Sequence, residues 1–246
     1  MQNTTSKKPL YKVAVIGFVL IIIGILLAMT GPLGVRADQW GFGVAMNFIK
    51  TDAYTGIFGS LLCLSGLIFT RPGGKYRGFG YSLVGLVVVI PMIMFLFGWK
   101  QAKQNLPPIQ DIATNTDEPL SFWEAPNSKE YGGEAVAVQQ HEFYPDVQPL
   151  IISLPAEQVF DLALEIAEDR GWTLWNPSRD DLHIEATERT FWFGYSDDVS
   201  IEISELEANS SQVDMRSTSR YGGGGDGGTN ANRIRAFFKD LQAVAA

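Results

Sequence analysis

The residues with the most potential chemistry surround a glycine-rich loop near the C-terminus, RYGGGGDGGTNANRIR at 220–235. A strand, a glycine-rich turn and a helix N-terminus in this order can bind phosphate, because free backbone N–H groups and the helix dipole attract an anion. Arg220 and Arg233 would add positive charge there. Asp226, in contrast, would repel an anion. Capture of an anion or another polar ligand is therefore one hypothesis for this loop.

The other hypothesis is that the loop is a flexible connection. Its spacing matches neither the G-x-x-x-x-G-K-S/T of a P-loop nor the G-x-G-x-x-G of a dinucleotide-binding unit. Thr229 and Asn230 are residue types that commonly cap the start of a helix. We favour a connection capped by one of these two residues over a phosphate site.

A second group of charged residues lies on the predicted strands before this loop. Asp197 and Asp198 are adjacent, and paired carboxylates can bind a metal or act as acid and base. Arg216 and Arg220 fall on the outward face of the predicted neighbouring strand. We interpret the group mainly as a cluster of cross-strand salt bridges. An enzyme that uses these four residues beside the glycine-rich loop is the alternative.

Other motifs that could carry chemistry give weaker signals. DIATNTD places Asp111, Thr114 and Asp117 close together, but its spacing does not fit an EF-hand calcium loop. His141 and His183 are the two histidines, and strand alternation puts His183 on a solvated polar face. The sequence contains no H-E-x-x-H, no G-x-S-x-G and no Cys/His pairing. We expect no catalytic residue, no cofactor and no metal site.

Hydrophobic periodicity predicts the elements that must position these residues. Residues 149–246 give the order β-α-β-β-β-β-α, in which DLHIEATER, DDVSIEISEL and QVDMRSTSR alternate as half-buried strands do. Helical spacing of apolar residues recurs in PAEQVFDLALEIAED and in NRIRAFFKDLQAV. We predict an α+β core with an antiparallel sheet of about five strands and both helices on one face. Residues 103–148 are expected to be a linker and an irregular lead-in.

Residues 1–102 predict a membrane domain. Three apolar runs predict transmembrane helices at about 13–30, 54–70 and 79–99, and a run of ~20 residues suits a bilayer core of about 30 Å. The runs contain no ionisable residue, so we expect an anchor more than a conduit.

Charge distribution predicts the orientation of these helices. Residues 1–102 carry nine basic and two acidic residues, whereas 103–246 carry 10 basic and 25 acidic residues. The N-terminal segment and the loop RPGGKYRG at 71–78 hold most of the Lys and Arg near the helices, which indicates that both are cytoplasmic. Three spans would then place the acidic domain in the periplasm of a bacterium, anchored in the inner membrane. Its negative charge argues against binding nucleic acid.

Four blocks of the second half resemble the DUF1499 family of bacterial and plastid proteins. They read LPPIQDIATNTDEP, YPDVQPLIISLPAEQVFDLALEIAEDRGW, FWFGYSDDVSIEI and VDMRSTSRYGGGGDGGTNANRIRAFF, and they span about 104–242. The glycine run at 222–225 is longer than the family pattern. The resemblance implies no activity, because the family has no known function. It implies recurrent polar positions at Asp111, Thr114, Asp117, Asp197, Asp198, Arg216, Ser219, Arg220, Asp226, Asn230 and Arg233.

Together these observations lead to a functional hypothesis with two alternatives. We expect a membrane-anchored periplasmic module that binds a small ligand or another envelope protein without catalysis, with the lipid bilayer as a further partner. The candidate ligand-binding residues are Asp197, Asp198, Arg216, Arg220, Asp226, Asn230 and Arg233. One alternative is an enzyme or a binder of a small anion or metal at the Asp/Arg cluster. The other is an accessory subunit of a membrane complex.

Overall fold

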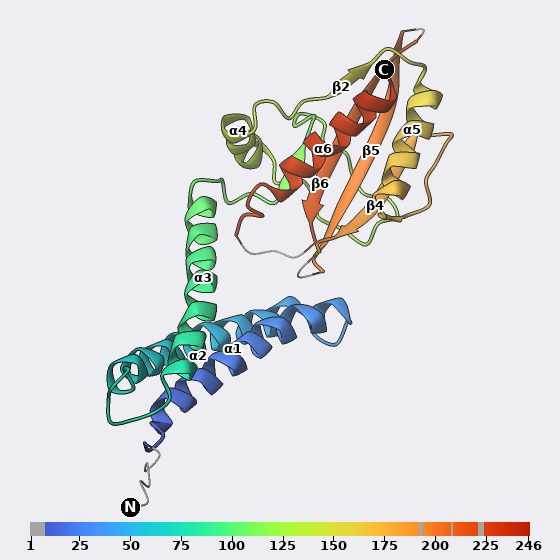
Figure 1. Ribbon diagram of the computed structural model, residues 1–246. Coiled ribbons are helices and arrows are strands. Elements are labelled where there is room, and N and C mark those ends of the chain that lie inside the picture. Colours follow the sequence, from blue (N-terminus) through green and yellow to red (C-terminus); the bar gives the residue numbers. More distant parts are fainter. Residues whose placement is uncertain (1–7, 192–193, 208, 221–223) are drawn as a thin grey trace, which may run out of the picture. The chain divides into compact units, whose positions relative to one another are not determined.

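The chain divides into two compact units, Met1–Gln101 and Ala102–Ala246 (Figure 1). The computed structural model describes residues 8–191, 194–207, 209–220 and 224–246.

The first unit consists of three helices, α1 (Lys12–Arg36), α2 (Phe42–Phe69) and α3 (Phe79–Gln104). Among the described residues, two helices are long and apolar enough to cross a membrane, Lys12–Arg36 and Gly43–Phe69. The third predicted span is present as a helix, but its described apolar stretch, Phe79–Met94, is shorter than these two. The structure thus supports two of the three predicted membrane helices.

Helices α1 and α2 are longer than the sequence predicts. The loop expected between the first two spans is reduced to residues 37–41. The Trp40 indole N–H donates to the Gly31 carbonyl oxygen at 3.1 Å, and the Trp40 ring contacts the Phe48 ring at a centroid distance of 5.3 Å. Helix packing of this kind overrides the low helix propensity of the glycines in this segment. As a result, the charged Lys50 and Asp52 lie within α2.

Glycine allows α1 and α2 to approach each other closely. A Cβ atom on Gly17 would lie 2.9 Å from the Gly59 carbonyl oxygen, and a Cβ on Gly59 would lie equally close to the Gly17 carbonyl oxygen. Further along α1, a Cβ on Gly24 would lie 2.9 Å from the Asp52 carboxylate. Small residues at such positions bring helix backbones together, as is common in membrane helix pairs.

The second unit is an α+β domain with a six-stranded antiparallel sheet. The strands lie in the order β1-β6-β5-β4-β3, and β2 pairs with the same edge of β6 as β1 does. The elements are β1 (Asp111–Ala113), α4 (Glu134–Phe143), β2 (Leu150–Ile152), α5 (Ala156–Asp169), β3 (Thr173–Leu174), β4 (His183–Arg189), β5 (Ser196–Glu207), β6 (Ser210–Ser219) and α6 (Thr229–Val244).

From β2 onward, the elements follow the predicted order β-α-β-β-β-β-α. The additional elements, β1 and α4, come from the segment 103–148 that we expected to be irregular. Strand β1 is only three residues long and pairs with β6, about a hundred positions later. Local periodicity cannot reveal so short a strand, because its partner lies far along the chain.

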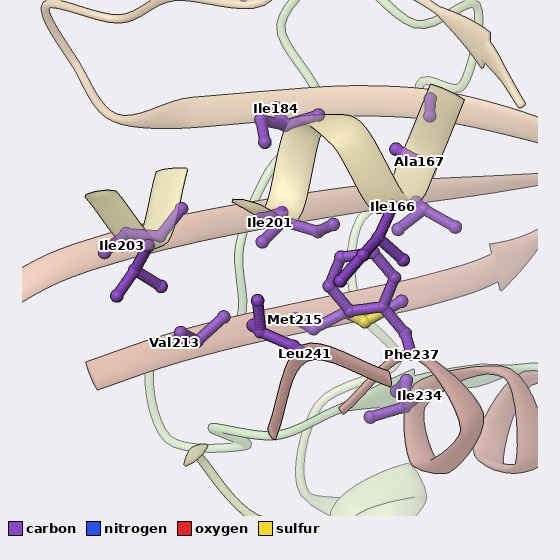
Figure 2. Packing of buried hydrophobic residues seen from close by; sticks show 14 of the residues in the cluster. Ile166, Ala167, Ile184, Ile201, Ile203, Val213, Met215, Ile234, Phe237 and Leu241 are labelled. Atoms are coloured by element: carbon purple, nitrogen blue, oxygen red, sulfur yellow. The ribbon is translucent and has the colours of Figure 1, made fainter. Parts of the chain in front are cut away.

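The apolar core fills the space between one face of the sheet and helices α5 and α6 (Figure 2). Ile184, Ile201 and Met215 point from the strands toward Phe237 and Leu241 of α6, and all five are fully buried or nearly so. Each such side chain contributes roughly 1.5–3 kcal/mol by leaving water. Both helices therefore lie on one face of the sheet, as predicted.

Candidate functional site

The opposite face of the sheet is polar, but it is not solvated. It is covered by residues 119–131, which we call the covering segment. Beneath it lie buried polar side chains at alternate positions of the three long strands: His183, Glu185, Thr187, Asp198, Ser200, Arg216 and Thr218. The alternation in the sequence correctly predicts that these side chains share a face. The prediction that His183 is solvated is wrong, because the cover comes from a distant part of the chain.

Glu185 holds the covering segment onto the sheet. Its side chain is 1% exposed and accepts backbone N–H bonds from Trp123, Glu124 and Ala125 at 2.5, 2.9 and 2.7 Å. Burial alone would raise the pKa of Glu185, but the hydrogen bond from His183 and the three backbone N–H groups outweigh burial and lower the pKa. Glu185 is therefore a buried carboxylate whose charge the backbone stabilises.

His183 lies between Glu185 and the ring of Trp123. The two rings stack with a centroid distance of 3.9 Å and an interplanar angle of 11°. His183 Nε2 lies 3.1 Å from Glu185 Oε1 and 3.4 Å from Ser200 Oγ. A Ser-His-acid relay needs the acid and the hydroxyl on different ring nitrogens. Here Glu185 and Ser200 approach the same nitrogen. The acid nearest the other nitrogen, Glu202, lies 3.9 Å from Nδ1, too far for a hydrogen bond, so the geometry does not activate Ser200 as a nucleophile.

Asp198 forms the second polar cluster under the cover. Arg220 donates to its two carboxylate oxygens at 3.0 and 2.6 Å, and Thr187 Oγ1 donates at 2.6 Å. Asn127 of the covering segment donates at 2.9 Å. Arg220 and Asp198 thus form the cross-strand salt bridge that the sequence suggested, and the amide of Asn127 closes it from above.

Arg216 forms the third cluster and is 2% exposed. It donates to both oxygens of Asp111 at 2.9 and 2.7 Å, and to the carbonyl oxygens of Leu120 and Lys129 at 2.6 and 3.0 Å. Its guanidinium also lies over the Phe122 ring. The resemblance grouped Arg216 with Asp111, and the structure brings these two residues into contact across the β1–β6 pair.

A hollow of about 310 Å³ opens beside Arg216. The hollow is lined by Arg216 and by residues of the covering segment, which are Pro119, Ser121, Phe122, Asn127, Ser128, Lys129, Glu130 and Tyr131. The Tyr131 hydroxyl is buried and has no hydrogen-bond partner among the described residues. Burial, aided by the nearby Asp111 carboxylate and opposed by Arg216, raises the pKa of Tyr131 to about 12. At neutral pH Tyr131 therefore keeps its proton as a hydrogen-bond donor.

Asp197 points to the other face of β5, so the two adjacent aspartates do not form a carboxylate pair. Asp197 is buried and bonds the Arg233 guanidinium of α6 at 2.6 Å. Burial raises the pKa of Asp197, although Arg233 opposes the rise. Arg233 also bonds Glu188 and, at 2.8 Å, the hydroxyl of Ser217. Burial would lower the pKa of Arg233, but the carboxylates of Asp197 and Glu188 outweigh burial and raise this pKa.

Asp226 occupies the helix N-terminus that could otherwise bind an anion. One carboxylate oxygen accepts the backbone N–H of Gly228 at 2.8 Å and the other accepts that of Asn230 at 2.6 Å. The N-cap residue of α6 is Gly228, and the side chain that caps the helix is that of Asp226 rather than that of Thr229 or Asn230. The Asn230 side chain instead donates to the Gln110 carbonyl oxygen at 2.9 Å. Residues 221–223 of the glycine-rich loop lie outside the described residues.

The remaining predicted polar residues belong to the β1 edge. Thr114 is buried, donates to Asp214 at 3.0 Å, and accepts the backbone N–H of Met215 at 2.9 Å. Asp117 is exposed, and its backbone N–H donates to Asn115 at 3.2 Å. Among the described residues, His, Cys, Asp and Glu side chains form no group of three that could hold a metal ion.

Sequence reasoning missed Glu185, Asn127 and Tyr131. Glu185 could have been noticed as a carboxylate at the centre of a strand that alternates between core and polar positions. Asn127 and Tyr131 lie in SFWEAPNSKEY, where three aromatic residues and a proline interrupt a polar stretch. That composition indicates a segment packed onto the domain, but its target on the sheet cannot be read locally.

A family model described as "Protein of unknown function (DUF1499)" matches residues 111–241. The match begins at the first residue of β1 and ends within α6. It includes the covering segment and all three polar clusters. No curated protein matches the chain.

Proposed function

The chain belongs to the DUF1499 family, and we propose that it is a membrane-anchored module of the bacterial cell envelope that binds a small polar ligand without catalysis. The family itself supplies no activity, so the proposal rests on the two units of the chain.

The proposed anchor is supported by the apolar surface of the helices. Leu26 of α1 and Leu61 of α2 are each 57% exposed, and they belong to a long series of exposed apolar side chains on both helices. A protein in water rarely leaves so much apolar surface uncovered. The lipid bilayer is therefore the proposed partner of this unit.

We propose three spans, with a cytoplasmic N-terminus and a periplasmic α+β domain in the inner membrane. Support comes from the Lys and Arg residues near the N-terminus and in the 71–78 loop. Helix α3 has 26 residues and would be about 39 Å long. Val87 and Met94 on α3 are exposed apolar residues like those of α1 and α2.

The observation that carries the binding role is the hollow beside Arg216. Its residues offer donors that the fold has not fully used. The Tyr131 hydroxyl has no partner among the described residues. Lys129 Nζ has three donor hydrogens and, within the part of the chain that the structure describes, donates to one acceptor, the Ser219 carbonyl oxygen. The charge of Arg216 is balanced by Asp111. Such a hollow suits a small ligand rich in hydrogen-bond acceptors, with Phe122 and Tyr131 as its apolar sides.

Thermal unfolding of the full chain in detergent tests this role. Acetate, inorganic phosphate, glucose and ATP would be added separately at rising concentration. A ligand at 100 times its dissociation constant adds about 2.7 kcal/mol of stability, so we expect a rise in melting temperature with at least one probe. Tyr131→Phe removes only the hydroxyl and should reduce that rise.

Tyr144→Phe is the matched control, because the Tyr144 hydroxyl is also buried without a partner among the described residues but does not line the hollow. A rise that Tyr131→Phe leaves unchanged would contradict binding in this hollow. No rise with any probe would remove these four ligand classes from the proposal.

A further inference from the structure

The covering segment, residues 119–131, has almost no apolar anchor on the sheet. Among its residues only Ala125 and Asn127 are buried. Its largest side chain, Trp123, is 55% exposed and stacks on the polar ring of His183. The apolar core between the sheet and helices α5 and α6 contains no residue of the covering segment, all of which the structure describes. Release of the segment would therefore leave that core intact.

Polar bonds hold the covering segment instead, and most of them use its backbone. The N–H groups of residues 123–125 all donate to the carboxylate of Glu185. The carbonyl oxygens of Leu120 and Lys129 both accept from the guanidinium of Arg216. Water can replace bonds of this kind when the segment leaves the sheet, so the net stability that each contributes is modest.

The charged groups of the sheet keep their partners when the segment is absent. Arg216 remains paired with Asp111, and Asp198 remains paired with Arg220. Asp198 would lose only the bond from the Asn127 amide. Opening therefore exposes these ion pairs to water without leaving a buried charge unpaired, which is the situation that makes the loss of a polar partner expensive.

The ligand hollow, in contrast, depends on the closed position of the segment. Apart from Arg216, every residue that lines the hollow belongs to the covering segment. Glu185 is not among the lining residues, although it accepts three of the bonds that hold the segment. Glu185 can therefore control the hollow without touching a ligand.

We propose that the covering segment is a lid that leaves the sheet while the core stays folded, and that Glu185 is the latch that holds it closed. A segment with few buried apolar contacts opens at a lower free energy than the core does. A ligand in the hollow binds the closed state alone and holds the lid shut, because a ligand shifts an equilibrium toward the state that it prefers. This last step rests on the proposed function.

Amide hydrogen exchange of the full chain in detergent, followed by mass spectrometry at low denaturant, tests the lid without a ligand. We expect the amides of residues 123–125 to exchange at least about tenfold faster than those at the centres of β5 and β6. Glu185→Gln should accelerate exchange at 123–125 further. Glu202→Gln, the same change at a side chain that is 43% exposed, should not.

Two results of this experiment would contradict the lid. If residues 123–125 exchange only as fast as the centres of β5 and β6, the segment opens with the core and is no lid. If the two variants accelerate exchange at 123–125 equally, Glu185 is not the latch.

The same measurement with acetate, inorganic phosphate, glucose or ATP tests the link to the hollow. A probe at 100 times its dissociation constant should slow exchange at 123–125 about 100-fold, because binding to the closed state alone makes opening rarer by that factor. Tyr131→Phe should reduce this protection. A probe that raises the melting temperature through Tyr131 but leaves exchange at 123–125 unchanged would overturn the link and leave the proposed function standing. Fast exchange at 123–125 with no effect of any probe would support the lid and remove these ligand classes.

Discussion

At the residue scale, Glu185 shows how this domain stabilises a buried charge. Glu185→Gln keeps the size of the side chain but removes its charge and replaces one acceptor oxygen by an amide donor. The backbone N–H groups of Trp123, Glu124 and Ala125 would then lose part of their acceptor. We expect a loss of about 2 kcal/mol in the free energy of unfolding. Hydrogen exchange at residues 123–125 should become faster, and chemical denaturation measures the stability.

Glu202→Gln is the control, because the Glu202 carboxylate lies 3.9 Å from His183 and its side chain is 43% exposed, whereas that of Glu185 is buried. An equal loss of stability in both variants would show that the backbone N–H groups are not the cause.

Because the pKa of Glu185 is lowered in the folded chain, the stability that this residue contributes should decrease as the pH falls. In the folded chain this pKa lies below its ordinary value of 4.5. Its contribution to stability is therefore complete above about pH 4.5 and is lost as the pH falls through the lower folded value. The difference in stability between the wild-type chain and Glu185→Gln should shrink over this acidic range. A difference that stays constant from pH 6 to pH 3 would contradict this assignment.

Residue alternation predicted the sheet faces well and burial poorly. Ile184, Ile201 and Met215 were assigned to the core, where they lie. Glu185 and Arg216 were assigned to the outward face, which is correct, but that face is buried under residues 119–131. Alternation shows which side chains share a face. It carries no information about a cover contributed by a segment sixty or more positions away.

At the element scale, the close contact of α1 and α2 depends on glycine. Gly17→Ala would place a Cβ atom 2.9 Å from the backbone of α2 at two points, Gly59 O and Cys63 N, so the helices must separate. We expect a loss of roughly 1–3 kcal/mol, typical of overpacking. The denaturation midpoint of the full chain in mixed micelles with rising SDS measures this loss.

Gly43→Ala is the matched control within α2, because a Cβ atom there would have no neighbour within 4 Å. Alanine also has the higher helix propensity, so this variant should be as stable as the wild type or slightly more stable. If both variants behave alike, the α1–α2 contact does not limit the stability of this unit.

Helix prediction succeeded where the apolar residues of a helix form a single stripe that packs on the core of the domain. In α5 the apolar residues Val159, Phe160 and Ala163 are buried as predicted. The ends of α1 and α2 were missed because Gly31, Gly34 and Trp40 have the composition of a loop, and their contacts across the helix pair are not visible in either helix alone.

At the scale of the whole molecule, the number of spans in the proposed anchor decides on which side of the membrane the domain would lie. With three spans, alkaline phosphatase fused after residue 104 should be active, because it folds only outside the cytoplasm. Green fluorescent protein fused there should be dark. With two spans the outcome is reversed. A fusion in the 37–41 turn is the internal control, since with the proposed cytoplasmic N-terminus both arrangements place it in the periplasm. A phosphatase that is inactive there would contradict the proposed orientation itself.

The pairing of β1 with β6 has a consequence for the order of events during synthesis. Arg216 reaches Asp111 across 105 positions, and Thr114 reaches Asp214 across 100. Strand β1 therefore has no strand partner until β6 has been made, and the bonds from Arg216 to the cover at Leu120 and Lys129 form only then. Contacts this distant in sequence form slowly. The nascent chain must stay open through elongation, and the strand made first is among the last to be locked in place.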